Sequence, residues 1–436
     1  MHFDYGLDAR PPLLRSLVLG LQWAVVATSL VIILGKVAAG VHLAPGEEIG
    51  YLQKLFFITA ASTLVQVFWG HRLPVLSGPA TTVVLGVLTS QGASANTCDT
   101  TVAVGGLLLA ALSVTGLFGV VRRLFTRRVV AVVLLLIAFT LAPTIQRLML
   151  DVGGGASPVA NLAFALCLVT AMFLLHRRLT GFWKSTLIVW SMLAGSLVYL
   201  SVLGRAAPAV GGAPLLRGFF SGLTTRPSLD PGLLISFFFC YLALAVNDIG
   251  AIQAMGPLLN PGGMDRRITR GMTLTGLSNV LAGFFGVIGV VNFSLSVGVV
   301  VSTACASQLA LVPGGLLMLL LSFSPAVIQL LGSVPSVVIG CLLLYILTSQ
   351  FASGLLLAFQ QEGGARFELE DGVAIGLPVI LGTIMAFLPA DVVATFPAGL
   401  RPTLGNGFVV GVASTLLLEH VLFRRRARAP RAALGE

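Results

Sequence analysis

Charged side chains are scarce in this sequence. Of its 436 residues, 10% are charged and 56% are hydrophobic. Soluble domains carry about 25% charged residues, so this composition excludes an ordinary water-soluble globular protein. It indicates an integral membrane protein with little mass outside the bilayer.

Paired cysteines and catalytic motifs are also missing. No C-x-x-C pair is present and no cysteine clusters with histidine, which argues against a metal site or a disulfide framework. We expect most of the cysteines to be small apolar packing residues. There is no metal triad, no G-x-S-x-G turn and no phosphate-binding loop, so we expect neither an enzyme nor a cofactor. The five cysteines are Cys98, Cys167, Cys240, Cys305 and Cys341.

The apolar runs lack the period-two alternation of a barrel strand, so the membrane spans are expected to be helical. A helical span needs about 20 mainly apolar residues. The first run, from Leu17 onward, is too long for a signal peptide and has no small-residue cleavage site. We interpret it as a retained helix.

Positive charge is present in excess, with a net charge of +10. The basic residues gather in short clusters between apolar runs, which is typical of cytoplasmic loops rather than of a nucleic-acid-binding patch. We therefore expect a multi-pass protein of the plasma (inner) membrane, embedded in the lipid bilayer, with no nucleic-acid partner. The clusters are RRLFTRR (122–128), HRRLTGFWK (176–184), DRRITR (265–270) and FRRRARAPR (423–431).

About fourteen apolar segments follow one another along the chain. If all of them cross the membrane, every strong basic cluster falls on one side and both termini are cytoplasmic; omitting segment three or ten breaks this pattern. The segments run from 17 to 38, 55 to 69, about 78 to 90, 101 to 121, 129 to 150, 159 to 175, 185 to 203, 233 to 254, 272 to 290, 290 to 307, 309 to 331, 337 to 359, 373 to 388 and 408 to 423.

The segments divide into two halves of seven. Because seven is odd, the second half enters the membrane from the opposite side, which makes the halves an inverted repeat. We place the first repeat at residues 13–205 (segments 1–7), a connecting loop at 206–231, the second repeat at 232–424 (segments 8–14) and a basic cytoplasmic tail at 425–436.

The third segment of each half is short and begins with small polar residues. Gly78 lies 65 residues after Leu13, and Ser294 lies 62 residues after Gly232, so the two short segments occupy matching positions. Such pairs indicate a transport site near the bilayer midplane. We expect two extended strands that pair with each other, each followed by a half-helix whose free N–H groups face a ligand. The alternative, two ordinary short helices or loops, explains one such segment better than two matched ones.

Six stretches in succession resemble motifs of one transporter family. They are LGLQWAVVA (19–27), LPVLSGPATT (73–82), NDIGAIQAM (247–255), RRITRGMTLTGLSNVLAGFFG (266–286), SVGVVVSTA (296–304) and VPSVVIGCLLLY (334–345). In order and spacing they resemble the nucleobase–ascorbate transporter family, the uracil and xanthine permeases, over nearly the whole chain. The resemblance implies a core domain (segments 1–4 and 8–11) that moves against a gate domain (segments 5–7 and 12–14), often in a homodimer.

The resemblance also implies where a substrate binds, between the half-helices of segments three and ten and segment eight. Gln22 is kept from the family motif, although a helix–helix contact explains it equally well. Tyr345 falls where the family often has a gate contact, and ordinary packing is the alternative. The expected substrate-binding residues are Gln22, Ala80, Thr81, Asn247, Phe293, Ser294, Leu295 and Tyr345.

Two positions depart from the family pattern. Asn247 and Leu295 stand where the family usually has glutamates. The amide of Asn247 has two donors and an acceptor for a carbonyl/N–H edge, but it cannot titrate. Asp248 is the nearby acid and our coupling candidate for H⁺ or Na⁺, because burying a charge in a span is costly and generally serves function. A structural acid bonded to a neighbouring helix is the alternative.

The sequence therefore predicts a secondary transporter of a small molecule, with a nucleobase such as uracil or xanthine as its substrate. A carrier of a small anion, of the sulfate or bicarbonate type, is the alternative with the same fold, because two half-helix N-termini suit an anion. Against this alternative, segments three, eight and ten contain no Lys or Arg, and Phe293 suits a stacked ring. A membrane scaffold or sensor that transports nothing is the third possibility.

Overall fold

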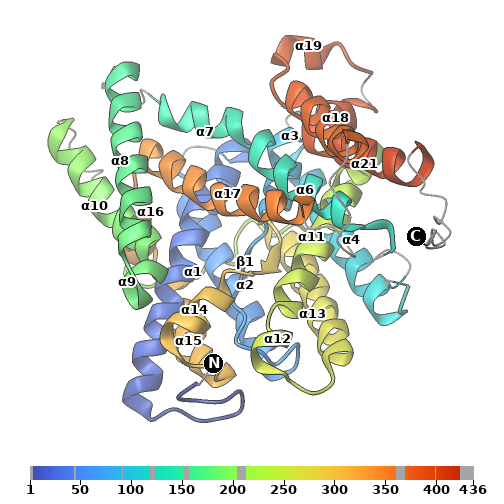
Figure 1. Cartoon of the computed structure of the whole chain (residues 1–436). Coiled ribbons are helices and arrows are strands. Elements are labelled where there is room, and N and C mark those ends of the chain that lie inside the picture. Colours follow the sequence, from blue (N-terminus) through green and yellow to red (C-terminus); the bar gives the residue numbers. More distant parts are fainter. Residues whose placement is uncertain are drawn as a thin grey trace, which may run out of the picture.

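The computed structural model describes residues 3–43, 46–90, 92–117, 119, 123–151, 157–203, 213–359, 369–397 and 399–422. This part of the chain is built of helices around one short two-stranded ribbon (Figure 1). Within it, eight helices are long and apolar enough to cross a membrane, or nine if a bent pair counts as one span. The chain is therefore a multi-pass integral membrane protein.

The helices form two packed groups, the first of which surrounds the ribbon. In this group α4 packs along α13, α15 packs on α1 and α2, and α11 contacts α3 and α4. The members are α1 (Leu13–His42), α2 (Glu48–Phe68), β1 (Ser77–Pro79), α3 (Thr81–Thr89), α4 (Ala95–Val114), α11 (Pro231–Gln253), α12 (Gly256–Leu259), α13 (Met264–Phe285), β2 (Val290–Asn292), α14 (Ser296–Thr303), η1 (Gln308–Leu311), α15 (Val312–Leu321) and α16 (Pro325–Gly332).

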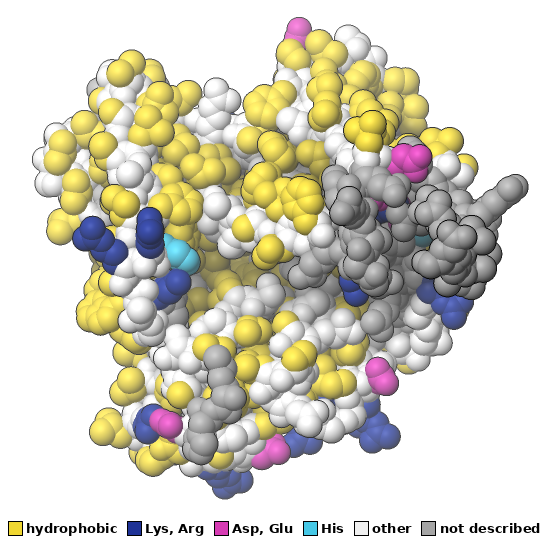
Figure 2. Space-filling model, viewed as in Figure 1, with side chains coloured by type: hydrophobic (Ala, Val, Ile, Leu, Met, Phe, Trp, Pro, Cys, Tyr) yellow, Lys and Arg dark blue, Asp and Glu magenta, His cyan; other side chains and the backbone are white. Residues whose placement is uncertain are grey.

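The second group is centred on α6, which packs against α17, α18 and α21, while α17 also contacts α7, α8 and α10. Large apolar side chains are exposed on its outer helices, including Val159, Leu197 and Ile384, and Figure 2 shows apolar surface over this part of the molecule. Such surfaces suit the lipid interior. The members are α6 (Arg127–Thr140), α7 (Ala142–Met149), α8 (Pro158–Arg178), α9 (Gly181–Ser185), α10 (Leu187–Val202), α17 (Ser336–Phe359), α18 (Leu369–Ala386), α19 (Ala390–Ala394), α20 (Arg401–Leu404), α21 (Gly407–Leu417) and η3 (Leu418–Leu422).

The two groups meet along a seam. There α11 contacts α20 and α21, α14 contacts α9, and α1 contacts α10. The amide of Asn406, which precedes α21, donates to the hydroxyls of Thr89 (2.9 Å) and Ser236 (3.1 Å) in the first group. The division of the chain into a moving core and a gate remains a prediction.

Glycines bring α4 and α13 into close contact. A Cβ atom on Gly276 would lie 2.6 Å from the backbone nitrogen of Ala110, and one on Gly106 would lie 2.6 Å from the carbonyl oxygen of Gly276. Side chains at these positions would force the backbones apart. Small residues at a helix contact are a usual way of packing helices in membranes, where apolar surface alone gives no preference for protein over lipid.

One predicted span is wrong in outline. The sequence suggested a single segment eleven from Leu309 to Leu331, whereas the helices η1 and α15 are bent by 101° from α16. The break is at Ser324, which is extended (φ −110°, ψ 90°) because proline follows it, and Pro325 cannot donate a hydrogen bond back into α15.

Two other segments differ in detail. Segment five consists of α6 and α7, which meet at Leu141 and together count as one span of 23 residues. Segment fourteen consists of α21 and a π-helical turn, η3, and its last residue, Phe423, lies outside the described part, as do the tail at 425–436 and residues 206–212 of the connecting loop. The count of fourteen crossings, the inverted repeat and the domain boundaries remain predictions.

Candidate functional site

The centre of the first group is the ribbon of β1 and β2. The strands are antiparallel, with Ser77 opposite Asn292, Gly78 opposite Val291 and Pro79 opposite Val290. Beyond the register pairs, the backbone of Phe293 donates to Leu76 (2.8 Å) and that of Ala80 donates to Gly289 (2.9 Å). The prediction that the two extended stretches pair, each leading into a short helix, is confirmed. Pairing thereby satisfies the backbone polar groups that the two strands direct toward each other, as the membrane requires.

Side chains fix the ribbon to its neighbours. Asp248, on α11, is fully buried and accepts a hydrogen bond from the backbone of Asn292 (2.9 Å). The hydroxyl of Ser77 donates to the Asn292 side chain (2.9 Å), and the hydroxyl of Ser296 accepts from the backbone of Leu76 (3.0 Å). Asp248 thus has a visible structural contact, to a strand rather than to a helix.

A further layer of polar side chains supports β2 from α2 and α13. Gln66 and Asn292 each donate to the hydroxyl of Thr275, at 3.0 and 3.3 Å. Asn279 donates to the carbonyl of Val290 (2.8 Å). Sequence reasoning did not single out these residues. A detectable signal was present, because Thr275 and Asn279 are polar, lie four residues apart on one helix face and interrupt an apolar span.

Phe293 lies against the ribbon. Its ring occupies the place of a side chain at Gly78, since a Cβ atom there would lie 2.2 Å from the ring. The ring is 9% exposed. Glycine at position 78 is therefore what allows Phe293 to fold over β1, and the ring has a fixed position at the start of α14.

Three polar side chains near the ribbon are free. Thr81 begins α3 and is half-buried, Asn247 is half-buried on α11, and Ser294 is exposed just before α14. Within the described part of the chain none of these side chains has a hydrogen-bond partner. The helix α3 runs antiparallel to α11. Gly86, in the second half of α3, contacts Phe237 in the first half of α11, whereas the ribbon, which directly precedes α3, contacts Asp248 in the second half of α11. Its N-terminus therefore points toward the part of α11 that carries Asn247.

The other predicted residues are placed differently. Ala80 is fully buried at the start of α3, and Leu295 is half-buried at the start of α14. Gln22, on α1, is 4% exposed and has a bonding partner. Tyr345, on α17, has its hydroxyl 2.5 Å from Nδ1 of His176 and its ring beside Phe173, both on α8. Tyr345 is thus bonded within the second group, and its role as a gate contact remains a prediction.

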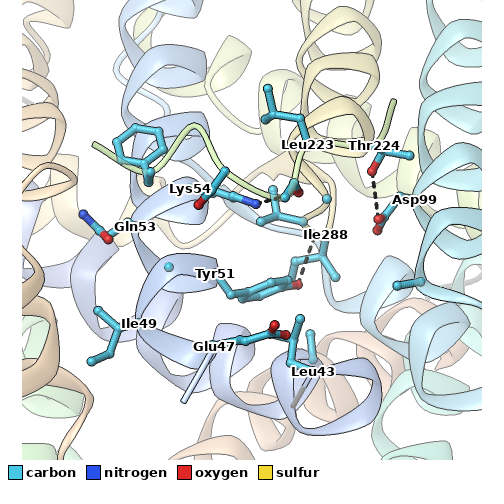
Figure 3. Close-up of a pocket in the computed structure, with 18 of the residues that line it drawn as sticks. Leu43, Glu47, Ile49, Tyr51, Gln53, Lys54, Asp99, Leu223, Thr224 and Ile288 are labelled. Carbon is cyan, nitrogen blue, oxygen red and sulfur yellow. Dashed lines mark hydrogen bonds between the residues drawn. The ribbon is translucent and has the colours of Figure 1, made fainter. Parts of the chain in front are cut away.

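The two described cavities lie elsewhere. One, of about 920 Å³, opens beside the first turns of α2 and α4 and includes Tyr51, Lys54 and Asp99 in its wall (Figure 3). The other, of about 540 Å³, is mostly apolar and lies between α6, α7, α8 and α17. Sequence reasoning identified neither cavity, because their walls come from helix ends far apart in the chain. Among the described residues there is no group of three or more His, Cys, Asp or Glu side chains that could hold a metal ion.

A family model described as "Permease family" matches residues 14–391, most of the chain. The chain belongs to the Permease family. This permease is 27% identical to the "Putative purine permease YwdJ" of Bacillus subtilis (strain 168), over 94% of this chain and 97% of that protein. It is 26% identical to the "Xanthine permease" of the same organism, over 93% of each chain. It is 23% identical to the "Nucleobase transporter PlUacP" of Paenibacillus larvae, over 85% of this chain and 86% of that one.

Solved structures share the fold of the permease. The transmembrane domain of the cyanobacterial bicarbonate transporter BicA superposes with a TM-score of 0.62 and 13% identity, over 86% of this chain and 97% of that chain. The structure of SLC26A9 superposes with a TM-score of 0.60 and 15% identity, over 95% of this chain and 66% of that chain. At such low identity these similarities show the fold and no more.

Proposed function

We propose that this permease is a secondary active transporter of nucleobases of the uracil or xanthine type. The substrate is held beside the ribbon, between the N-termini of α3 and α14 and the middle of α11. The observation that carries the proposal is a contrast near the ribbon. Hydrogen bonds hold the ribbon to Asp248 and Ser296, while the side chains of Thr81, Asn247 and Ser294 have no partner among the described residues. The relatives named as purine, xanthine and nucleobase transporters support the same substrate class.

The chemistry of the free groups fits a nucleobase edge. The amide of Asn247 can donate to a ring carbonyl and accept from a ring N–H at the same time. The two hydroxyls add groups that donate or accept, and the ring of Phe293 offers a face for stacking. The N-terminal ends of α3 and α14 favour partial negative charge, which suits carbonyl oxygens.

The two packed groups suggest how transport proceeds. We assign the first group as a moving core and the second as a fixed gate, in an elevator-type alternating-access cycle. This assignment includes fourteen crossings in two inverted halves, cytoplasmic termini, a location in the inner membrane and a homodimer. The division of the packing into these two groups supports the assignment of a core and a gate.

Uptake into proteoliposomes tests the substrate. We expect accumulation of radiolabelled xanthine or uracil that unlabelled nucleobases suppress and that excess bicarbonate or sulfate does not. A matched variant, Asn247→Leu, should weaken uptake about tenfold, because it removes the hydrogen bonds to the ring edge while keeping the volume. Uptake of bicarbonate or sulfate without any nucleobase uptake would reject the proposal.

An anion carrier is the second candidate. Its support is the fold shared with BicA and SLC26A9 and the pair of half-helix N-termini. Yet α3, α11, α14 and the ribbon carry no Lys or Arg to balance an anion. A scaffold without transport predicts no uptake of either class, so the same assay separates the three functions.

Coupling is expected to involve Asp248 or to be weak. Neither Asn247 nor Leu295 can titrate, and Asp248 is the buried acid next to the ribbon. In Asp248→Asn the side-chain oxygen can still accept from the backbone of Asn292, so the ribbon keeps its anchor. We expect this variant to fold and to lose whatever proton dependence the wild type shows. The measurement is uptake at several imposed pH gradients, and a steep dependence that survives the substitution would reject Asp248 as the coupling group.

A further inference from the structure

The cavity of about 920 Å³ lies wholly within the first group. Its wall is made by the C-terminal part of α1, the first turns of α2 and α4, the end of α3, the chain just before β2, α16 and part of the segment 213–230 that leads into α11. This segment is bonded to the same group, since Gln53 donates to the carbonyl of Arg217 (3.1 Å) and the backbone of Thr224 donates to Phe284 (2.9 Å). The cavity is thus separate from the ribbon site.

One wall presents hydrogen-bond donors that have no acceptor. Lys54 is 9% exposed, and its ammonium group makes one hydrogen bond, to the carbonyl of Gly222 (2.9 Å). Among the described residues no carboxylate lies within 4.0 Å of it, so two of its three N–H donors are unused. Tyr51 is also 9% exposed, and its hydroxyl accepts from the backbone of Ile288 (3.1 Å) while donating to no described residue.

The facing wall presents an acceptor. One carboxylate oxygen of Asp99, on α4, accepts from the hydroxyl of Thr224 (2.9 Å), and the other has no partner in the described part of the chain. Figure 3 shows Tyr51 and Lys54 on one side of the cavity and Asp99 with Thr224 on the other, with Leu223 and Ile288 between them. Buried donors and acceptors without partners are costly, so such an arrangement favours a bound molecule that satisfies both walls.

We propose that this cavity is a second nucleobase-binding site of the permease, apart from the transport site; the inference rests on the proposed function. A base that spans the cavity places a ring carbonyl at Lys54 and Tyr51 and an N–H of its opposite edge at Asp99. The apolar side chains of Val87, Leu223 and Ile288 line the space for the ring faces. The volume is within the range of small-molecule sites and leaves room for a base with a substituent or with ordered water.

A purely structural role for Lys54 makes a different prediction. Gln53, the preceding residue, also fixes the segment 213–230 to α2, because its side-chain amide donates to the backbone carbonyl of Arg217. The same amide donates to the backbone carbonyl of Ser322 (2.9 Å). Figure 3 shows its side chain on the opposite side of α2 from Asp99. Gln53 also lines the cavity, but its amide nitrogen is already used by the carbonyls of Arg217 and Ser322. Gln53→Leu therefore removes these two hydrogen bonds and keeps the free donors of Lys54 and Tyr51, which makes it the matched control for Lys54→Gln.

The stoichiometry of xanthine bound to purified full-length protein, measured by equilibrium dialysis, tests the proposal. We expect two molecules per chain in the wild type and in Gln53→Leu. One is expected in Ser294→Trp, which fills the transport site, and one in Lys54→Gln/Asp99→Asn, where the asparagine can still accept from Thr224. None is expected when all three substitutions are combined. Each single substitution in the cavity should weaken the second site about tenfold.

The outcomes separate this proposal from the proposed function. The second site is disproved if the wild type transports xanthine but Ser294→Trp binds no xanthine. It is also disproved if Lys54→Gln/Asp99→Asn still binds two xanthine molecules per chain. In both cases the transport function stands. If the wild type neither binds nor transports any nucleobase, the proposed function itself fails. If the double variant does not fold, a second measurement uses the Ser294→Trp background with the substitution Ile49→Cys, which places a thiol in the cavity wall. Xanthine slows the labelling of this thiol if the cavity binds xanthine, and it leaves the labelling rate unchanged if the cavity does not.

Discussion

Replacing Ser294 with tryptophan is expected to abolish nucleobase uptake. Ser294 is exposed at the start of α14 and directly follows Phe293, whose ring is held in place by Gly78. An indole here projects into the space where the substrate meets the N-terminus of α14, and the fixed neighbouring ring cannot move aside. Excluding a ring from a fitted site costs several kcal/mol, so we expect uptake of xanthine or uracil to fall by about a hundredfold or more.

The control for this prediction is Val159→Trp. Val159 is 76% exposed at the start of α8, on the outside of the second group, so the same added volume meets no substrate. Uptake by this variant should match the wild type in the same proteoliposome assay. Full uptake by Ser294→Trp, in protein that elutes as a single species, would show that the substrate lies elsewhere.

Replacing Gly276 with leucine is expected to destabilise the protein more than any other change considered. The Cβ atom alone would lie 2.6 Å from the backbone of Ala110 and 2.7 Å from the carbonyl of Gly106, so α4 and α13 must separate. Overpacking costs about 1–3 kcal/mol even where side chains can adjust, and here the neighbours are backbone atoms, so we expect about 3 kcal/mol or more. Separation of these helices also displaces Thr275 and Asn279, which support β2.

Thermal melting in detergent, followed by the loss of the monodisperse species, measures the effect. The control is Leu277→Ala, one residue further along α13, where the leucine is 49% exposed and faces outward. That change should alter the free energy of unfolding by less than about 1 kcal/mol. A melting temperature of Gly276→Leu equal to that of the control would mean that the two helices do not pack as closely as described.

The sequence predicted the membrane class, the paired strands and the two half-helices well, because each depends on a local signal. Long apolar runs define spans, and small polar residues at Gly78 and Ser294 mark the interruptions. The bend between α15 and α16 was missed because the run from Leu309 to Leu331 is mainly apolar, and only the short stretch from Ser322 to Pro325 marks the break.

The candidate site was predicted in part. Thr81 and Ser294 were named from the matched short segments of the two repeats and Asn247 from the family resemblance, and the structure leaves their side chains free near the ribbon. The supports Asn292 and Thr275 were not named, because a buried hydrogen-bond network depends on which helices pack together, and one sequence does not reveal that. The cavity at Lys54 was missed for the same reason, since its walls come from segments that meet only in three dimensions.

The ribbon also constrains the order in which the protein can be assembled. Ser77 pairs with Asn292, which is synthesised more than two hundred residues later. Until β2 is synthesised, the backbone groups of β1 are unpaired in the membrane, and other parts of the first half or water must form their hydrogen bonds. Contacts between such distant residues form late and slowly. Insertion of the first seven segments therefore yields an unfinished intermediate, and chains truncated before β2 should be substrates for quality-control proteases rather than stable half-proteins.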